Sequence, residues 1–480
     1  MPSHQEKQAE AAWTPRLEAR EGPVYVAIAE AIAEDMRIGR LTPGQRLPPQ
    51  RTLAGRLGLD FTTVSRAYRE AQRRGLVDAH VGQGTFVRTA APAAPAAPVA
   101  GERPTGAAAA FVDMTMNQPP VPDRPDLLDR LRLSAAEAVA GLDARSLLRY
   151  PGGGSKDTAA DREAGVQWLR GRLPDVTADR IALCPGTQGA LLALLTALAR
   201  PGDAVCAEAL TYPGFKAVAR QLGLTVLGAP MDADGLDPDA LRTLFAAHRP
   251  KLLYCMPTLH NPTTATMPLE RREAVAAVAR EFGVAIVEDD IYGPLAPDGP
   301  PLIAALAPDI TFHIAGLAKC LSPALRIAYV VVPDARQSLQ VTGALRATTL
   351  MASPFTGAIA ARWIGDGTAA QLLSAIREEA RVRQRLAAEL LPPGCAAAQP
   401  EGFHLWLRLP ANWTRGEFAT HLRTCGIAAV PSDTFAVGDG VPEALRICLG
   451  AAADRAETRW VLSVLAAALE QGPVLTGVII

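Results

Sequence analysis

A stretch rich in alanine and proline divides this chain into two parts. Residues 89–110 read TAAPAAPAAPVAGERPTGAAAA; they have no periodic apolar face, and their prolines favour an extended spacer. About 88 residues precede this stretch and about 370 follow it. Because 480 residues exceed what one hydrophobic core usually serves, we expect two or three domains, with a spacer over residues 89–112.

The overall composition is that of a globular protein. Hydrophobic residues make up 49% of the chain and charged residues 20%, and the formal net charge is −1. No apolar run approaches the ~20 residues of a membrane span, and the polar N-terminus lacks the apolar core of a signal peptide. The seven cysteines are scattered without a CxxC pair, which argues against disulfides and zinc. We therefore expect a cytoplasmic protein with neither a metal site nor a membrane partner.

The first part, residues 21–88, has the pattern of three helices followed by a short β-hairpin. Apolar residues recur every four positions from Val24, a short second helix ends at Gly58, and Asp60 begins a third helix over 61–73. Two short strands then flank the turn Gly82-Gln83-Gly84. This order predicts a mainly α winged helix-turn-helix, preceded by a flexible arm over residues 1–20.

Positive charge is concentrated in the same part of the chain. Between Arg37 and Arg88 there are ten arginines and three acidic residues, a balance of +7. A compact basic region in a neutral chain is typical of a nucleic-acid-binding module, although a solvated charged face has the same composition. In a winged helix the second helix of the motif enters the major groove of double-stranded DNA. The expected DNA contacts are Thr62, Thr63, Ser65 and Arg66 on that helix, Arg46 and Arg51 at phosphates, and Gly84 in the wing.

The run PGQRLPPQRTLAGRLGLDFTTVSRAYREAQRRGLVDAHVGQGTFV, residues 43–87, resembles the GntR-type winged helix. It contains, in order, G-x-x-L-P-x-x-R-x-L-A, T-V-x-x-A-Y, R-G-L-V and G-x-G-T-F-V. The resemblance implies a double-stranded DNA operator as partner. It also implies that Arg51, Thr63, Arg66 and Gly84 lie where that family contacts DNA.

The second part, residues 113–470, alternates short apolar runs with helical stretches. The runs are IALC (181–184), AVCA (204–207), LTVLG (224–228), KLLYCM (251–256), VAIVE (284–288), TFHIA (311–315) and IAYVVV (327–332). Continuous apolar strands indicate a mostly parallel sheet covered on both faces, so we predict an α/β domain. A smaller α+β lobe is expected from about residue 350, with alternating strands after about 395, and residues 471–480 form a tail.

Polar residues able to hold pyridoxal 5′-phosphate (PLP) follow these strands. The cofactor needs a lysine for an imine, an acid at the pyridine nitrogen, a helix N-terminus and arginine at its phosphate, and donors at its 3′-oxygen. The chain offers, in order, Gly186-Thr187-Gln188, Tyr212, Asn261, Asp289 with Tyr292, Lys319 and Arg326. Since open α/β sheets bind ligands at the carboxyl ends of their strands, these residues form a candidate site.

That ordered series resembles the fold type I aminotransferases of classes I and II across about 113–470. The resemblance implies that Gly186, Thr187, Gln188 and Arg326 hold the phosphate, Asn261 and Tyr292 the 3′-oxygen, Asp289 the ring nitrogen and Lys319 the aldehyde, while Tyr212 stacks on the ring. It makes Lys319, Asp289 and Tyr212 the catalytic residues, Arg446 the clamp for a substrate or effector carboxylate, and Tyr150 a contact to the partner subunit's phosphate. One departure is Gly316-Leu317-Ala318 before Lys319, where the family usually has Ser-x-Ser. Two hydroxyl donors are therefore missing, and we expect somewhat weaker cofactor affinity.

The two parts together resemble the MocR group of regulators. The resemblance implies a homodimeric, PLP-dependent transcription regulator. As its mechanism we expect that it senses an amino compound through aldimine exchange at Lys319, and we favour an absence of sustained turnover. Two alternatives stay open at this point. One is an active aminotransferase, transferring an amino group from an amino acid to a keto acid, that carries a DNA-binding domain. The other is a regulator whose aminotransferase-like domain no longer binds PLP.

Overall fold

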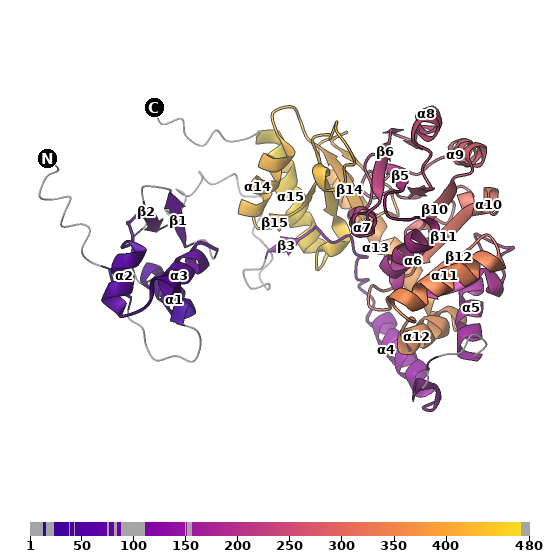
Figure 1. The fold of residues 1–480 in the computed structure, drawn as a ribbon, viewed down its shortest axis with the longest axis horizontal. Helices are drawn as coiled ribbons and strands as arrows, with labels where there is room; N and C mark the ends of the chain where they lie inside the picture. Colours follow the sequence, from indigo (N-terminus) through magenta and orange to yellow (C-terminus); the bar gives the residue numbers. More distant parts are fainter. Residues whose placement is uncertain are drawn as a thin grey trace, which may run out of the picture. The chain divides into compact units, whose positions relative to one another are not determined.

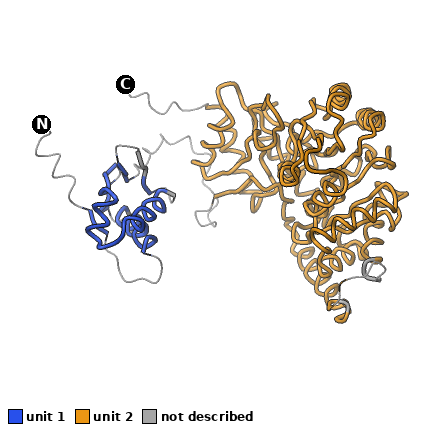
Figure 2. The backbone as a smooth tube through the Cα atoms, viewed as in Figure 1, with its two compact units in different colours: residues 1–99 blue, residues 100–480 orange. Residues whose placement is uncertain are grey.

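The computed structural model describes residues 13–15, 24–37, 39–42, 44–73, 76–80, 84–87, 111–148, 150 and 156–471. The chain divides into two compact units, residues 1–99 and 100–480 (Figure 2). This division falls within the predicted spacer, of which residues 89–110 lie outside the described part.

The N-terminal unit is a winged helix built from three helices and one hairpin. Its elements are α1 (Val24–Arg37), α2 (Gln50–Leu57), α3 (Phe61–Arg73), β1 (Val77–His80) and β2 (Gly84–Val87), with the two strands antiparallel (Figure 1). Helix α3 turns Val64, Ala67 and Tyr68 into the core, as its spacing predicts. The predicted wing residues Gly82 and Gln83 lie outside the described residues.

One residue expected in the N-terminal arm belongs to the core of this unit. Trp13 is only 4% exposed, and its indole nitrogen donates a hydrogen bond of 2.8 Å to Oδ2 of Asp35 on α1. Arg40 donates to the other oxygen of the same carboxylate, at 3.1 Å. The domain therefore begins before residue 21. A single tryptophan in a polar stretch has no periodic pattern from which this contact could be predicted.

A seven-stranded sheet forms the centre of the larger unit, and every predicted apolar run contributes a strand to it. The strands are β4 (Ile181–Cys184), β5 (Ala204–Glu208), β6 (Thr225–Ala229), β9 (Leu252–Cys255), β10 (Ala285–Asp289), β11 (Thr311–Gly316) and β12 (Ala328–Val331). They lie in the order β4-β12-β11-β10-β9-β5-β6, and only β12 runs antiparallel to its neighbours. The mostly parallel sheet is thereby confirmed.

Helices cover both faces of this sheet. One face packs against α5 (Lys156–Leu169), α6 (Gly186–Leu198), α7 (Pro213–Gln221) and α11 (Ala335–Thr348). Outside this layer, α12 (Pro354–Gly365) packs on α5 and on α4 (Pro125–Ala140). The other face packs against α8 (Pro238–His248), α9 (Leu269–Phe282) and α10 (Ile303–Leu306). Successive strand residues alternate between the two cores: Tyr254 and Val287 face the first, Leu253 and Ile286 the second. None of the helices in the described ranges has the length and hydropathy needed to cross a membrane.

A smaller lobe contains a four-stranded antiparallel sheet. Its strands β13 (Ala396–Ala397), β14 (His404–Arg408), β17 (Ala444–Cys448) and β16 (Val430–Pro431) lie in that order, with α13 (Thr368–Leu390), α14 (Arg415–Thr424) and α15 (Arg455–Gln471) around them. A further pair joins β3 (Val112–Asp113) to β15 (Ile427–Ala428). Two boundaries differ from expectation. Val112 lies in a strand rather than in the spacer, and Trp363 of α12 packs into the large core, so the small lobe begins later than about residue 350.

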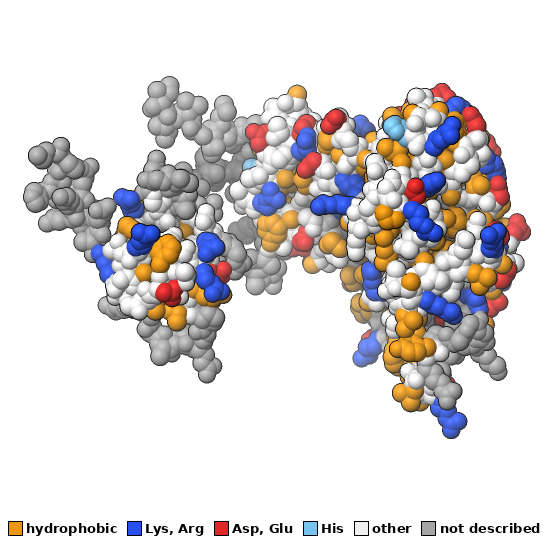
Figure 3. All heavy atoms as spheres, viewed as in Figure 1, with side chains coloured by type: hydrophobic (Ala, Val, Ile, Leu, Met, Phe, Trp, Pro, Cys, Tyr) orange, Lys and Arg blue, Asp and Glu red, His pale blue; other side chains and the backbone are white. Residues whose placement is uncertain are grey.

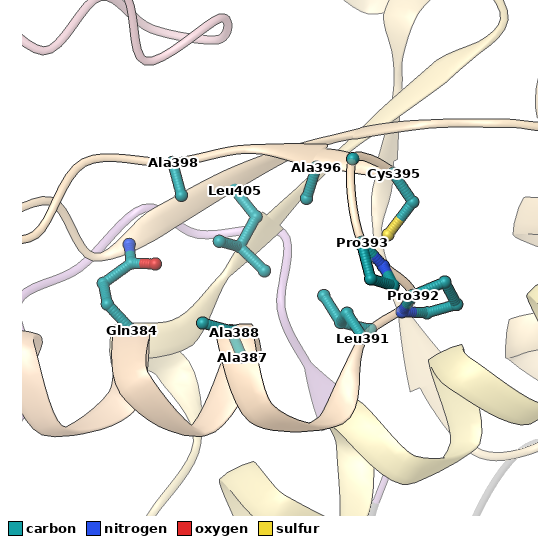
Figure 4. Close-up of a pocket in the computed structure, with 11 residues that line it drawn as sticks. Gln384, Ala387, Ala388, Leu391, Pro392, Pro393, Cys395, Ala396, Ala398 and Leu405 are labelled. Atoms are coloured by element: carbon teal, nitrogen blue, oxygen red, sulfur yellow. The ribbon is translucent and has the colours of Figure 1, made fainter.

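The C-terminal end of α13 and strand β14 enclose a pocket of about 230 Å³ (Figure 4). Gln384 lines this pocket, together with apolar side chains such as Leu391 and Leu405. Its Nε2 donates hydrogen bonds to the carbonyls of Gly402, at 2.7 Å, and His404, at 3.2 Å. These two bonds hold the start of β14, the strand that carries His404 toward the candidate site described next.

Candidate cofactor site and nucleic-acid interface

The carboxyl ends of the parallel strands bring the predicted cofactor residues to one edge of the large sheet. Residues 186–188 form the first turn of α6, directly after β4, and Tyr212 immediately precedes α7. Asn261 follows β9, Asp289 ends β10, Tyr292 begins the short turn Gly293–Leu295, and Lys319 follows β11. The charges of Asp289, Arg326 and Arg446 all act on Lys319, so the structure brings these residues together.

The Lys319 amine is partly buried and donates a hydrogen bond to the backbone carbonyl of Asn117. Burial lowers the pKa of Lys319, and the positive charges of Arg446 and Arg326 lower it further, against the opposing effect of Asp289. A lowered pKa leaves a larger fraction of the amine unprotonated near neutral pH. Lys319 is therefore prepared to attack a carbonyl carbon.

Asp289 has one carboxylate oxygen paired and one unpaired. The residue is 1% exposed, and Oδ2 accepts a 2.8 Å hydrogen bond from the Tyr254 hydroxyl. Oδ1 is buried and has no hydrogen-bond partner among the described residues. Burial raises the pKa of Asp289 to about 7, and the neighbouring Asp290 adds to the rise. A positively charged hydrogen-bond donor, such as a protonated ring nitrogen, would stabilise the buried carboxylate of Asp289 and pair its Oδ1.

The first turn of α6 lies beside the guanidinium of Arg326, an arrangement that a phosphate site requires. Gly186 has a φ of +75°, and a Cβ placed there would lie 3.3 Å from Cζ of Arg326. Thr187 follows Gly186, and its buried Oγ1 has no hydrogen-bond partner among the described side chains. The amide groups of a helix N-terminus, a free hydroxyl and a guanidinium are groups that bind a phosphate.

The glycine that departs from the family pattern has a local explanation. A Cβ placed on Gly316 would lie 2.5 Å from Thr187 Oγ1 and 3.0 Å from the side chain of Ile291. A serine at position 316 therefore cannot fit beside Thr187 in this arrangement. The Thr187 hydroxyl, which belongs to the expected phosphate set, occupies the space beside Gly316.

Tyr212 and Arg446 are each held by a second predicted residue. Gln188 Nε2 donates to the Tyr212 hydroxyl at 2.9 Å, and burial raises the pKa of Tyr212. Arg446 donates from Nη1 to Oδ1 of Asn261 at 2.9 Å, and its guanidinium lies 5.1 Å from the ring centre of Phe435. These contacts fix the guanidinium at the junction of the two lobes, since β17 carries Arg446 and the segment after β9 carries Asn261.

Tyr292 makes contacts that the sequence did not predict. Its hydroxyl accepts a 2.7 Å hydrogen bond from Nδ2 of Asn117, and Asn117 also approaches Nδ1 of His404 at 3.3 Å. Asn117, His404 and Tyr254 were all missed. Of these, only Tyr254 could have been recognised from the sequence, because its hydroxyl is a polar group within the apolar run KLLYCM. Tyr150 is 75% exposed on its own chain, and its expected role lies at the partner subunit's phosphate.

The residues present fit PLP. An unpaired buried acceptor on Asp289, an unpaired hydroxyl on Thr187 beside Arg326, and the depressed pKa of Lys319 match the ring nitrogen, the phosphate and the aldehyde.

The predicted DNA-contacting residues lie on the surface of the N-terminal unit. The Asp60 carboxylate accepts from the backbone amide of Thr63 at 2.9 Å and from its hydroxyl at 2.6 Å, and it also accepts from the hydroxyl of Thr62. These bonds hold the pKa of Asp60 well below its usual range. Because both hydroxyl hydrogens point to Asp60, Thr62 and Thr63 offer oxygen acceptors to a ligand.

The arginines of this unit also have defined positions. Arg66 lies over the ring of Tyr25, at 4.4 Å from its centre, and Arg51 lies 5.7 Å from the ring centre of Phe61. Arg46, Arg51 and Gly84 share a pocket of about 300 Å³ between the helices and the wing. Figure 3 shows basic side chains on the visible face of this unit. Ser65 is half-buried on α3. A positive, partly concave face of this kind suits a phosphate backbone.

Two family models match the chain. Residues 109–465 match aminotransferase class I and II, and residues 24–87 match bacterial regulatory proteins, gntR family. The chain is 31% identical to the HTH-type transcriptional regulator YdeF of Bacillus subtilis, over 90% of this chain and 91% of that protein. It is 28% identical to the HTH-type transcriptional regulator TauR of Rhodobacter capsulatus, over 86% of this chain and 90% of TauR.

Solved structures show the same fold for the larger unit. The α-aminoadipate aminotransferase LysN of Thermus thermophilus, in complex with N-(5′-phosphopyridoxyl)-L-leucine, covers 75% of this chain and 92% of its own, with a TM-score of 0.65 and 24% identity. Kynurenine aminotransferase of Pyrococcus horikoshii covers 75% and 91%, with a TM-score of 0.66 and 23% identity. The family match indicates pyridoxal 5′-phosphate as the cofactor. The chain belongs to the class I and II aminotransferase family and, with its gntR-family domain, is a transcriptional regulator of the MocR type.

Proposed function

We propose that this regulator binds operator DNA through its winged helix and senses an amino compound through PLP held on Lys319. The observation that carries the proposal is the unpaired buried oxygen of Asp289 in a site that also contains Lys319 and Arg446. This set supports a working cofactor site in a chain whose other domain is built for DNA. The protein would act in the cytoplasm.

The proposed roles of the residues follow from their contacts. When bound, PLP supplies an aldehyde carbon that bonds covalently to amines and a ring that draws electrons from them. Asp289 would hold the proton of the ring nitrogen, Asn261 and Tyr292 would contact the 3′-oxygen, and Tyr212 would lie against the ring. The phosphate would be held by the first turn of α6, Gly186-Thr187-Gln188, together with Arg326.

We propose an effector that carries both an amine and a carboxylate. Arg446 is buried and already paired with a neutral amide oxygen on Asn261, so an incoming carboxylate would be a stronger partner for it. The effector's amine would displace Lys319 from the aldehyde carbon. The freed Lys319 amine has an acceptor in place, the carbonyl of Asn117.

Signal transfer would begin at the junction of the two lobes. Arg446 lies on β17 of the small lobe, whereas Asp289 and Lys319 follow strands of the large sheet. A ligand that contacts both sets stabilises one position of the small lobe over others. In the assembled regulator, a change in the position of the small lobe would change the affinity of the winged helices for DNA.

We further propose that the regulator is a homodimer. Helix α4 leaves the apolar side chains of Leu128, Leu133 and Val139 exposed, and Leu148 beyond it is 88% exposed. Figure 3 shows hydrophobic side chains gathered over α4 on the visible face. An apolar surface of this kind supports burial against a second copy. A dimer would also present two winged helices to paired half-sites.

The active aminotransferase is the other candidate function, because the Lys319, Asp289 and Arg446 set is also what transamination requires. The two regulators compared above match this chain over 91% and 90% of their own length, DNA-binding domain included, which does not favour this candidate. Repeated transfer of amino groups from an amino acid to a keto acid by the purified protein would establish it.

The testing experiment is an absorbance spectrum of the full-length protein loaded with PLP, followed by DNA binding with and without candidate amino acids. We expect a visible band that borohydride abolishes and that is missing in Lys319→Ala. Lys251→Ala, which removes an exposed lysine, is the matched control and should keep the band. If wild-type protein forms no band after PLP is added, the cofactor part of the proposal fails.

A further inference from the structure

Three residues from distant parts of the chain form a hydrogen-bonded series beside Lys319. His404 lies at the start of β14, Asn117 follows β3, and Tyr292 follows β10. His404 is 1% exposed, Asn117 5% and Tyr292 3%, so water does not compete for these bonds. His404 and Asn117 are 287 residues apart in the sequence, and neither belongs to the residue set proposed to contact the cofactor.

The His404 ring has one possible tautomer in this environment. Its Nε2 lies 3.1 Å from the backbone carbonyl of His260, which can only accept a hydrogen bond. Nε2 therefore carries the ring hydrogen. Burial lowers the pKa of His404 to about 3, and the positive charge of Arg446 acts in the same direction, so the ring is neutral and Nδ1 is a bare acceptor.

The bare Nδ1 sets the orientation of the Asn117 amide. Nδ2 of Asn117 lies 3.3 Å from Nδ1 of His404 and 2.7 Å from the Tyr292 hydroxyl oxygen, so its two hydrogens serve both acceptors. Rotating the amide by 180° would put Oδ1 against the lone pair of Nδ1. Tyr292 thus accepts from Asn117, and the hydrogen bonds of the described residues leave its own hydrogen uncommitted.

We propose that His404 and Asn117 are positioning residues that make Tyr292 a hydrogen-bond donor toward the cofactor. Without His404, the Asn117 amide is free to turn its oxygen to Tyr292, and the tyrosine then donates to Asn117 instead of into the site. The backbone carbonyl of Asn117 also accepts a hydrogen bond from the Lys319 amine. Asn117 therefore connects the cofactor lysine to the residue expected at the 3′-oxygen. This inference rests on the proposed binding of PLP at Lys319.

The test is the apparent pKa of the visible absorbance band, measured by pH titration of the full-length protein loaded with PLP. A hydrogen donated to the 3′-oxygen stabilises its negative charge and weakens its hold on the neighbouring proton, so the band titrates at lower pH. In His404→Leu we expect the apparent pKa to rise by about one unit, as for the loss of one hydrogen bond to a charged group. Tyr292→Phe should raise it by a similar amount.

The double variant separates positioning from general disturbance. If His404 acts through Tyr292, adding His404→Leu to Tyr292→Phe should produce no further shift. His404→Asn should restore the wild-type value in large part, because its amide oxygen can occupy the position of Nδ1. Phe403→Leu is the matched control: Phe403 packs edge-on against the Tyr292 ring at 5.9 Å without a hydrogen bond, and its loss should leave the titration unchanged.

Circular dichroism and thermal melting of each variant establish that the protein is folded. An unshifted titration in folded His404→Leu, or equal shifts with and without the Tyr292 hydroxyl, would overturn the positioning role. These outcomes are distinct from a failure of the proposed function, in which wild-type protein would show no band to titrate. If His404→Leu does not fold, Asn117→Ala takes its place in the same double-variant comparison with Tyr292→Phe.

Discussion

Asp289, the residue proposed to hold the ring nitrogen of the cofactor, lowers the stability of the cofactor-free protein at neutral pH. Among the side chains that the structure describes, the Tyr254 hydroxyl is the one that donates to its buried carboxylate, and burial raises its pKa from 3.8 to about 7. In the cofactor-free protein the folded state therefore retains a proton that the unfolded chain loses. By linkage, the contribution of this group to stability is complete below pH 3.8 and falls as the pH rises toward 7.

We predict that Asp289→Asn removes this pH dependence. Without cofactor, the variant and the wild type should have similar free energies of unfolding at pH 4. Above pH 4 the free energy of unfolding of the wild type should fall relative to that of the variant by roughly 1.4 kcal/mol for each pH unit, up to pH 7. Thermal melts between pH 4 and 8 measure the difference. Glu208, whose pKa is also raised, to about 8, is present in both proteins; burial is the main cause of its shift, and only the smaller part that comes from the charge of Asp289 differs between them. A constant difference across this range would contradict the prediction. In the wild type, PLP should offset the loss at high pH.

The contact between Gly316 and Thr187 gives a second prediction at this scale. Gly316→Ala places a methyl group 2.5 Å from Thr187 Oγ1, so we expect a loss on the order of 1–3 kcal/mol in the free energy of unfolding, and weaker PLP binding. Adding Thr187→Ala should recover most of the stability, but not the PLP affinity. Gly343→Ala is the control. It has no neighbour within 4 Å on α11 and should stabilise slightly. Urea denaturation and PLP titration measure both quantities.

At the scale of elements, the sequence predicts those parts of the site that lie next to their own strand. Lys319, Asp289 and Asn261 each follow an apolar run, so one short segment of sequence predicts both the strand and the site residue at its end. The series His260–His404–Asn117 could not be read in this way. It joins segments 144 and 287 residues apart, through one backbone carbonyl and one amide orientation. The fit of Thr187 against Gly316 likewise depends on how α6 packs on β11.

The N-terminal segment is the element whose prediction changed most. Trp13 fills the core of the winged helix and donates to Asp35, so we predict that Trp13→Ala destabilises this unit by about 3 kcal/mol or more. Hydrogen exchange of α1 in the full-length protein, followed by mass spectrometry, should become faster. Trp13→Phe retains most of the packing and should have a smaller effect. Val24→Ala, at a side chain that is 44% exposed, is the control. Unchanged exchange in Trp13→Ala would mean that the arm is dispensable.

At the scale of the whole molecule, effector binding and DNA binding must obey thermodynamic linkage. If an amino compound changes the Kd for operator DNA by some factor, DNA changes the Kd for that compound by the same factor. The two sites lie in different units of the chain, so variants can separate binding from coupling. Arg51→Ala should weaken DNA binding and reduce the salt dependence by about one counterion, while leaving the PLP spectrum unchanged.

Lys319→Ala should have the opposite effect. We expect it to keep DNA binding and its salt dependence, because the predicted DNA contacts lie on the N-terminal unit, and to lose the response of DNA affinity to the amino compound. Effector titrations with and without operator DNA, followed by DNA-binding fluorescence anisotropy, measure the coupling factor from both directions. Lys251→Ala should retain the wild-type factor. A Lys319→Ala protein that still binds PLP and responds to the effector with the wild-type factor would show that the signal does not pass through exchange at this lysine. The ion pair between effector and Arg446 would then have to carry it, and Arg446→Lys would be the variant that loses coupling.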